Sequence, residues 1–349
     1  MSESIDTGIR DAEGGKQKAK ADPPARRTSA LAKRLAARFA LPRRKKATIS
    51  WPLRALRFAP VLPKGRTLLV PSFSSVSRPL GAAFEYVVRG QLQRINPRAI
   101  PDHWLAEEAL DAVSRHLREC GYLDIESEYT VEGMSGKPER FSVPAKAPEK
   151  LLAQLRKMLH RTKALHAQFI ADGVLGTELL ENYIKLARWH GGYVKWGTFS
   201  VPHDWNNADP QAVHELRSMY DLVKWEQFKA KRRCLLRPRF PLSSQHGQNE
   251  PDLVIDDLIV DLKTTASATL QRGDVDQVLR YFAHSEIEGF SRRRKGGITK
   301  LQLYYARFGD SVLIDLANDY PREKVEKYLA WYRQKCMPQI VNGLGRFDT

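Results

Sequence analysis

The chain has 349 residues, 42% of them hydrophobic, and a formal net charge of +17. This is enough apolar sequence for a sizeable core, and the charge indicates a polyanionic partner such as nucleic acid. No stretch reaches the roughly 18 to 20 apolar residues of a membrane span, and the N-terminus is polar, so we expect an intracellular protein without a membrane segment. Cys120, Cys234 and Cys336 are far apart, which favours a reducing cytoplasm and argues against a four-cysteine iron–sulfur cluster.

Residues 1–62 are predicted to form a basic, largely disordered tail. Positions 1–50 hold 13 Lys or Arg against 5 Asp or Glu, with paired glycines and prolines among them, a composition typical of disorder. Leu31, Leu35 and Phe39 recur at helical spacing within it, which predicts a short amphipathic helix. Such a helix can lie on a membrane, dock a protein or contact nucleic acid. We favour nucleic acid or a protein partner, because the apolar face is small.

The folded domain is expected to span residues 63–349 and to open with a helix over Leu80–Leu92. Phe84, Val88 and Leu92 form its apolar stripe, and Gly81 permits close packing against a neighbouring backbone. Residues from about 100 to 233 then form a large, mainly helical insertion. We expect its helices near His103–Cys120, Pro148–Asp172, Thr177–His190 and Pro210–Lys231, the third ending at Gly191-Gly192. The basic run Lys231, Arg232 and Arg233 closes the insertion, where it could hold a phosphate backbone.

After a strand at Cys234–Arg237, residues 250–265 predict a β-hairpin. Two aliphatic runs flank the pair Asp256-Asp257, the pattern of a two-residue loop. The register then pairs Ile255 with Leu258 and Leu253 with Val260, and it sets Asp252 opposite Asp261. Directly opposed side chains lie about 4.5 to 5.5 Å apart at Cβ, so two carboxylates there require a proton or a divalent cation between them.

Side chains alternate along a strand, so Asp261 and Lys263 share one face while Val260 and Leu262 are expected on the opposite, buried face. The hairpin therefore offers two hard oxygen ligands with an ammonium beside them. This set suits phosphodiester hydrolysis, in which carboxylates hold a metal ion and a cation orients the attacking water. The alternative is an ordinary edge hairpin whose acidic side chains are solvated.

A helix over Gly273–His284 follows, with Val275, Leu279 and Phe282 packed on the sheet. Gln277, Tyr281 and His284 form a second stripe, expected to face whatever lies over the metal. A basic turn at Arg292, Arg293 and Arg294 is a further candidate contact for nucleic acid. The chain then predicts strands at Lys300–Phe308 and Ser311–Leu316, joined at Gly309-Asp310, and a helix over Pro321–Lys335.

Together these residues resemble the PD-(D/E)xK nuclease superfamily in its RecB-like branch. The pattern is Pro-Asp, then Asp/Glu-x-Lys, then a helix with Gln-x-x-x-Tyr, here Pro251-Asp252, Asp261-Leu262-Lys263 and Gln277-x-x-x-Tyr281. The resemblance covers Pro251 to Phe282 and extends more weakly to the helix at Gly81–Leu92. It implies an α/β fold with a restriction-endonuclease-like core, a mixed central sheet flanked by helices.

The resemblance also implies roles for individual residues. Glu85 becomes the third carboxylate, and Glu85, Asp252, Asp261 and the Leu262 carbonyl would bind Mg²⁺ or Mn²⁺. Lys263 would position or activate the attacking water. Gln277 and Tyr281 would steer the nucleic acid strand. The further nucleic-acid contacts that we expect are Arg280, Lys231, Arg232, Arg233, Arg292, Arg293 and Arg294.

The sequence thus predicts a magnesium-dependent nuclease that acts on DNA in preference to RNA, with Asp252, Asp261 and Lys263 as its catalytic residues. The rival interpretation is a catalytically silent module of the same fold that only binds nucleic acid. A metal-independent nucleotide-handling enzyme is disfavoured, because the sequence has neither a Walker loop nor G-x-G-x-x-G.

Overall fold

A computed structural model of the chain describes residues 66–74, 77–101, 104–120, 123–126, 140–143, 146–196, 200–202, 205–242, 250–290 and 297–337. The predicted tail (1–62) and the basic turn at Arg292–Arg294 lie outside these residues. Within the described part, no helix is both long and apolar enough to cross a membrane.

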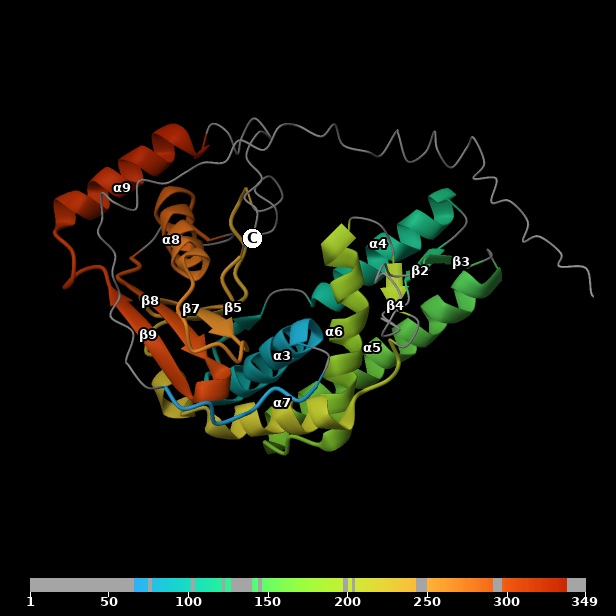
Figure 1. Cartoon of the computed structure of the whole chain (residues 1–349). Coiled ribbons are helices and arrows are strands. Elements are labelled where there is room, and N and C mark those ends of the chain that lie inside the picture. Colours follow the sequence, from blue (N-terminus) through green and yellow to red (C-terminus); the bar gives the residue numbers. More distant parts are fainter. Residues whose placement is uncertain are drawn as a thin grey trace, which may run out of the picture. The chain divides into compact units, whose positions relative to one another are not determined.

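The fold is α/β, built on a mixed sheet of six strands in the order β1-β5-β6-β7-β8-β9 (Figure 1). The strands β5, β6 and β7 pair antiparallel, β7 and β8 parallel, and β8 and β9 antiparallel. The short strand β1 pairs parallel with β5. The strand bounds are β1 Ile100–Pro101, β5 Cys234–Leu236, β6 Leu253–Ile255, β7 Leu258–Lys263, β8 Lys300–Tyr305 and β9 Asp310–Asp315.

The predicted hairpin register is confirmed, since Leu253 pairs with Val260 and Ile255 with Leu258. Asp256 takes the first loop position with a left-handed φ of 53°, a conformation that Asp tolerates better than most residues. Its carboxylate also accepts the backbone N–H groups of Lys231, Arg232 and Arg233. These bonds fasten the segment before β5 to the turn of the β6–β7 hairpin.

The two faces of the sheet carry different helices because side chains alternate along each strand. Val254 and Ile259 pack with α8 (Arg272–Ile287) and α9 (Arg322–Lys335). Leu253 and Val260 pack with α3 (Ser77–Ile95) and the helices of the insertion. As predicted, Val275, Leu279 and Phe282 bury the sheet-facing side of α8.

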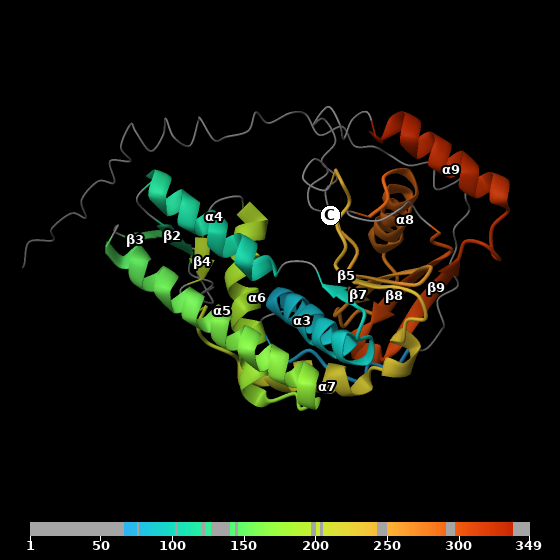
Figure 2. The ribbon, with the colours of Figure 1, turned by 180° about the vertical axis from the view of Figure 1, so that it is seen from behind.

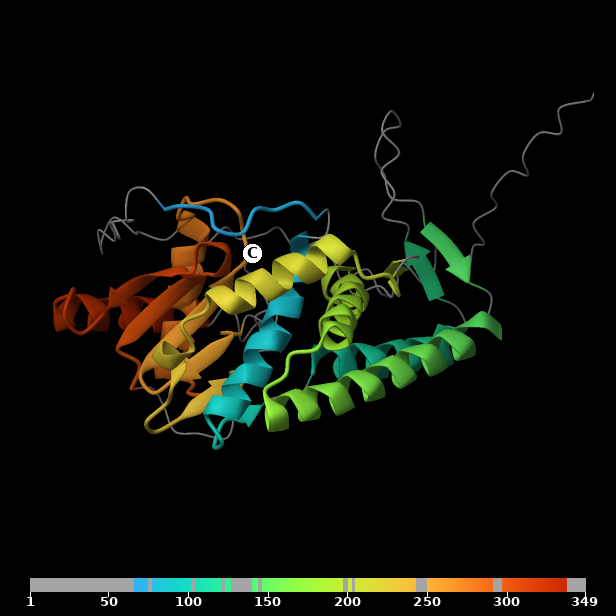
Figure 3. The ribbon, with the colours of Figure 1, turned by 90° about the horizontal axis from the view of Figure 1, so that it is seen from below.

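The insertion is mainly helical, as predicted. Three of its helices, α4, α5 and α6, lie against one another, and α3 packs on both α6 and α7 (Figures 2 and 3). It also contains a small sheet in the order β3-β2-β4. Its elements are α4 Leu105–Cys120, β2 Leu123–Glu126, β3 Arg140–Val143, α5 Lys146–Asp172, α6 Thr177–Trp196, β4 Ser200–Pro202 and α7 Pro210–Leu222.

Two predicted helix ends in the insertion are wrong. Helix α6 continues through Gly191-Gly192 to Trp196, because interior glycines cost only about 1 kcal/mol each and α6 packs along α3. Helix α7 stops at Leu222 instead of Lys231, and a 3₁₀ turn follows at Trp225–Phe228. There the side chain of Asn96 donates to the Phe228 carbonyl and accepts from the Ala230 N–H, which replaces the helical hydrogen bonds of that segment.

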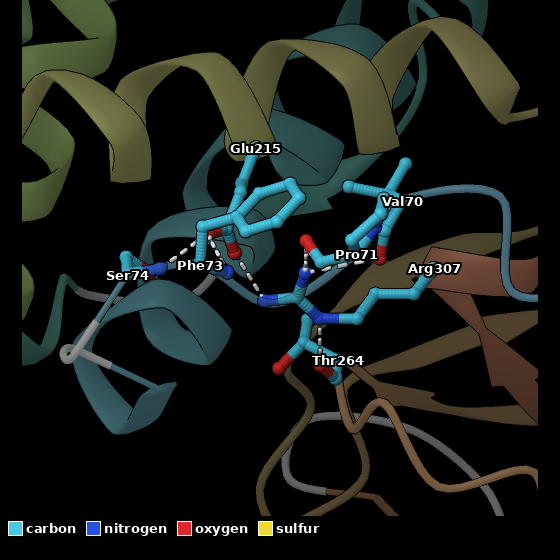
Figure 4. Close-up of polar contacts among 7 residues, drawn as sticks. All are labelled: Val70, Pro71, Phe73, Ser74, Glu215, Thr264 and Arg307. Carbon is cyan, nitrogen blue, oxygen red and sulfur yellow. Dashed lines mark hydrogen bonds and ion pairs between the residues drawn. The ribbon is translucent and has the colours of Figure 1, made fainter.

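A buried arginine joins the segment before α3 to the end of β7 (Figure 4). The Arg307 side chain donates to the Thr264 carbonyl at 2.7 Å and to the Pro71 carbonyl at 2.8 Å. It also forms an ion pair with Glu215 of α7, and both side chains are only 1% exposed. Arg307 therefore links α7, the segment 66–74 and the residue directly after Lys263.

The carboxylate of Glu215 completes this network from the other side. One oxygen accepts the backbone N–H groups of Phe73, at 2.8 Å, and Ser74, at 2.6 Å, while the other meets Arg307 (Figure 4). The network satisfies backbone groups that lie just before α3 begins. It thereby fixes where α3 starts relative to β7.

We expect Glu215→Ala to lower the free energy of unfolding by about 3 to 5 kcal/mol, because it leaves Arg307 as an unpaired buried charge. The measurement is equilibrium denaturation in urea. Glu178→Ala is the matched control, since the pair of Glu178 with Arg161 is more than half exposed on both sides and its loss is expected to have little effect on stability. Equal losses in the two variants would contradict this role of Glu215.

Candidate metal and catalytic site

The hairpin brings two carboxylates to the same face of the sheet. Asp252 directly precedes β6 and continues its register, which sets it opposite Asp261 of β7. The Asp252 Oδ2 atom accepts the backbone N–H of Leu262 at 2.6 Å, so this carboxyl points at β7. Asp261 is 3% exposed. Both side chains share the face of Val254 and Ile259, which is the face that α8 covers.

Glu85 reaches the same place from α3, far earlier in the chain. A Cβ atom on Gly81 would lie 3.1 Å from Thr264 Oγ1, a tight contact, so glycine favours the close approach of α3 to the residue that follows β7. Glu85 follows one helical turn later. Its charge raises the pKa of Asp252, and the charge of Asp261 raises the pKa of Glu85. Electrostatically, the three predicted carboxylates are therefore neighbours, and their sharing of one metal ion stays a prediction.

The electrostatics of the three acids is unfavourable. Burial is the largest cause that raises the pKa of Asp252 well above its usual value, and the charges of Glu85 and Asp261 add to it. Burial also raises the pKa of Glu85, against the opposing charges of Arg237 and Arg89. Like charges in a poorly solvated site favour protons or a bound cation.

Lys263 is bound by three acceptors. Its Nζ lies 2.9 Å from Asp261 Oδ2, 3.0 Å from Asp274 Oδ1 and 2.9 Å from Gln277 Oε1. Burial by itself lowers the pKa of Lys263, but the pairs with Asp261 and Asp274 outweigh it and raise the pKa. Lys263 is thus a cation held against Asp261, on the face that strand alternation predicted.

The Gln-x-x-x-Tyr pair continues this chain of contacts. Gln277 Nε2 donates to the Tyr281 hydroxyl at 2.6 Å, while its other amide atom accepts from Lys263. Tyr281 is only 2% exposed. In this structure the pair orients Lys263, and direct contact of Gln277 or Tyr281 with a nucleic acid strand stays a prediction.

The third residue of the predicted stripe does not face the site. His284 is 1% exposed; its Nε2 lies 2.9 Å from the Tyr332 hydroxyl of α9, and its Nδ1 pairs with Glu288. Arg280 also lies toward α9, where its charge opposes the burial that raises the pKa of Cys336 to about 12. The expectation for His284 was wrong because α9 packs beside α8 and takes up the end of that stripe.

The basic run Lys231–Arg233 lies at the turn of the hairpin, on the carboxylate of Asp256. Asp252 is four residues away along the strand, about 13 Å at the usual rise. The run precedes β5 directly in sequence. Because β5 is antiparallel to β6, the start of β5 at Cys234 pairs with the end of β6 at Ile255, which is the end farther from Asp252. A contact between this run and nucleic acid stays a prediction, and it would lie at this distance from the carboxylates.

Two features of the site were missed from the sequence. Asp274 lies one turn before Gln277 on α8, an i, i+3 spacing that could have indicated a common partner. Arg237 has a left-handed φ of 52°, its N–H donates to the Asp252 carbonyl at 2.7 Å, and its side chain pairs with Glu250 at 2.9 Å. No sequence signal identified Arg237, because its position depends on how β5 ends.

The donor chemistry fits a hard divalent cation. Carboxylate oxygens are the ligands that Mg²⁺ prefers, and the raised pKa values of Asp252, Asp261 and Glu85 are what such an ion would reverse. Among the described residues, no three His, Cys, Asp or Glu side chains already converge to hold a metal. Asp261 is paired instead with Lys263, and Asp252 with the Leu262 N–H.

Comparison of the chain with protein-family models, curated proteins and solved structures finds no match. Function is therefore inferred below from the geometry and electrostatics of these side chains.

We expect Asp252→Asn to stabilise the protein at pH 8 and to have little effect near pH 3. An acid whose pKa is raised in the folded state contributes stability below its unfolded pKa, and this is lost as the pH rises through the folded value. The pKa of Asp252 is raised from 3.8, so the difference between variant and parent should grow above about pH 4.

Thermal unfolding followed at several pH values measures this difference. Asp111→Asn, at an exposed position on α4, is the control for losing one carboxylate. If Asp252→Asn shifted the melting temperature equally at every pH, the buried repulsion would be refuted.

Proposed function

We propose that this chain is a divalent-metal-dependent nuclease that hydrolyses phosphodiester bonds, DNA in preference to RNA. The observation that carries the proposal is the placement of Asp252 and Asp261 on adjacent strands beside Lys263, with Glu85 as their electrostatic neighbour. Hydrolysis of a phosphodiester needs hard ligands for a metal ion and a cation close to them. This constellation supplies both.

Asp252, Asp261, Glu85 and the Leu262 carbonyl are the groups that would hold Mg²⁺ or Mn²⁺. The ion, when bound, would polarise the phosphate and lower the pKa of a bound water. Lys263, kept in place by Gln277 and Asp274, would orient that water or stabilise negative charge in the transition state. Gln277 and Tyr281 would limit where the Lys263 ammonium can lie.

The architecture is compatible with a restriction-endonuclease-like core, which we propose as the finer description of the fold. A mixed sheet carries the acids on adjacent strands β6 and β7, with α3 on one face and α8 on the other. The helical insertion separates α3 from these strands in sequence but not in space.

Nucleic acid is the proposed substrate because the net charge is +17 and much of the excess lies within the first 50 residues. Phosphate contacts by Lys and Arg release counterions and supply most non-specific affinity. The basic N-terminal tail could also recruit a protein partner. Buried, free Cys234 and Cys336 are compatible with the cytoplasmic location that we propose.

The second candidate is a module that binds nucleic acid without cleaving it. It is favoured by the state of Lys263, which donates to Gln277 and forms ion pairs with Asp261 and Asp274. In a silent module these contacts would be permanent. In an enzyme they must rearrange when metal and substrate bind.

We expect Asp261→Asn and Lys263→Met each to reduce Mg²⁺- or Mn²⁺-dependent cleavage by about 100-fold or more, since each removes a charged group at the reacting phosphate. The assay incubates purified protein with labelled single- and double-stranded DNA and RNA. Lys300→Met, at the start of β8 and away from the acids, should keep full activity.

A readout independent of turnover is the rise of melting temperature with Mn²⁺. The parent protein should be stabilised by the ion, and Asp261→Asn should not. Retention of nucleic acid without any product, in every metal tested, would support the silent module instead. Cleavage that survives the loss of Asp261 would exclude the proposed site.

A further inference from the structure

The Lys263 ammonium lies among three protein oxygens: it donates to Gln277 and forms ion pairs with Asp261 and Asp274. Asp261 lies on the same strand, whereas Asp274 and Gln277 come from α8, at 3.0 Å and 2.9 Å from Nζ. The Asp261 Oδ2 atom lies 2.9 Å from Nζ. A divalent cation on Asp261 would therefore have to share that carboxylate with Lys263.

Two of the three oxygen atoms around Lys263 belong to carboxylates, so the electrostatic attraction on the ammonium is shared between Asp261 and Asp274. The Asp261 and Asp274 oxygens lie at nearly equal distances from Nζ, 2.9 and 3.0 Å. The Lys263 side chain is 18% exposed and Asp274 is 20% exposed, against 5% for Asp261. Asp274 thus offers the ammonium a charged partner on the more open side, away from the buried acid.

The other polar groups around Lys263 do not provide this alternative. Gln277 is neutral, and its amide nitrogen is already bonded to Tyr281. Asp252 belongs to the proposed metal ligands, and its Oδ2 accepts from Leu262. Tyr305 of β8 lies under the guanidinium of Arg66, 4.6 Å from its ring centre. Among the described residues that face Lys263, Asp274 is the anion left to hold the ammonium when Asp261 is occupied.

We propose that Asp274 is a positioning residue that draws Lys263 off Asp261 and thereby lets the acidic cluster take up a divalent cation. The inference rests on the proposed metal site. Without Asp274, the whole charge of Lys263 bears on Asp261, and the ion must displace it at a greater loss of electrostatic energy. Asp274 itself is not a ligand in this scheme, and it acts through the lysine.

The test measures Mn²⁺ affinity by isothermal titration calorimetry on the full chain, without substrate. Asp274→Asn should bind Mn²⁺ about tenfold more weakly than the parent, in the range of couplings between charged neighbours. Asp276→Asn is the matched control: it removes the same charge from the same helix, but Asp276 pairs with Arg272. Its affinity should stay within about twofold.

A double-mutant cycle separates action through the lysine from a direct effect of the lost charge. Lys263→Met should bind Mn²⁺ more tightly than the parent, because the competing cation is gone. Adding Asp274→Asn to Lys263→Met should then change the affinity by no more than about twofold. Asp274→Glu, which keeps the charge, should restore most of the affinity, and it also serves if Asp274→Asn does not fold.

The possible results distinguish the role of Asp274 from the nuclease proposal. Parental affinity in Asp274→Asn, or the same tenfold loss with and without Lys263, would overturn the role of Asp274 and leave the nuclease proposal standing. A parent that binds no Mn²⁺ and cleaves no nucleic acid would end both proposals. Weak binding by Asp274→Asn that Asp274→Glu does not relieve would also overturn the inference.

Discussion

Repulsion among poorly solvated carboxylates is the constraint on which the arrangement around β6 and β7 depends. Burial raises the pKa of Asp252, Asp261 and Glu85, and like charges add to it: those of Glu85 and Asp261 act on Asp252, that of Asp274 on Asp261, and those of Asp261 and Glu250 on Glu85. A site of this kind is unfavourable unless other groups compensate it. Lys263 meets Asp261 directly, and Arg237 and Arg89 oppose the charge of Glu85.

The rest of the structure holds these groups in their places. Gly81 brings α3 against Thr264, and the Arg307–Glu215 pair fixes the segment before α3 to the residue that follows Lys263. On the other face of the sheet, α8 supplies Asp274 and Gln277 to Lys263. The contacts that balance the charges of the acids are therefore the same contacts that orient Lys263.

The cluster as it stands is balanced by protein groups, with the lysine in the position that neutralises Asp261. Occupation by a cation would require this balance to change. In the proposed nuclease, exchange between Lys263 and a metal ion on Asp261 would give a physical basis for metal dependence, because only side chains would need to move. The proposal also gives Asp274 of α8 a role that sequence motifs do not reveal.

The sequence by itself determined the hairpin, its register, the shared face of Asp261 and Lys263, and the packed stripe of α8. These follow from local rules, a period of two in strands and of 3.6 in helices, together with a loop pair that tolerates a left-handed residue. Only the tertiary structure decided that Glu85 lies close enough to Asp252 to raise its pKa, although the insertion separates them in sequence. It also decided that Asp274 forms a second ion pair with Lys263, and that His284 and Arg280 face α9. It also put Lys231–Arg233 at the far end of the hairpin, because antiparallel pairing reverses the chain. Such placements depend on which helix covers which face, and no local periodicity encodes that choice.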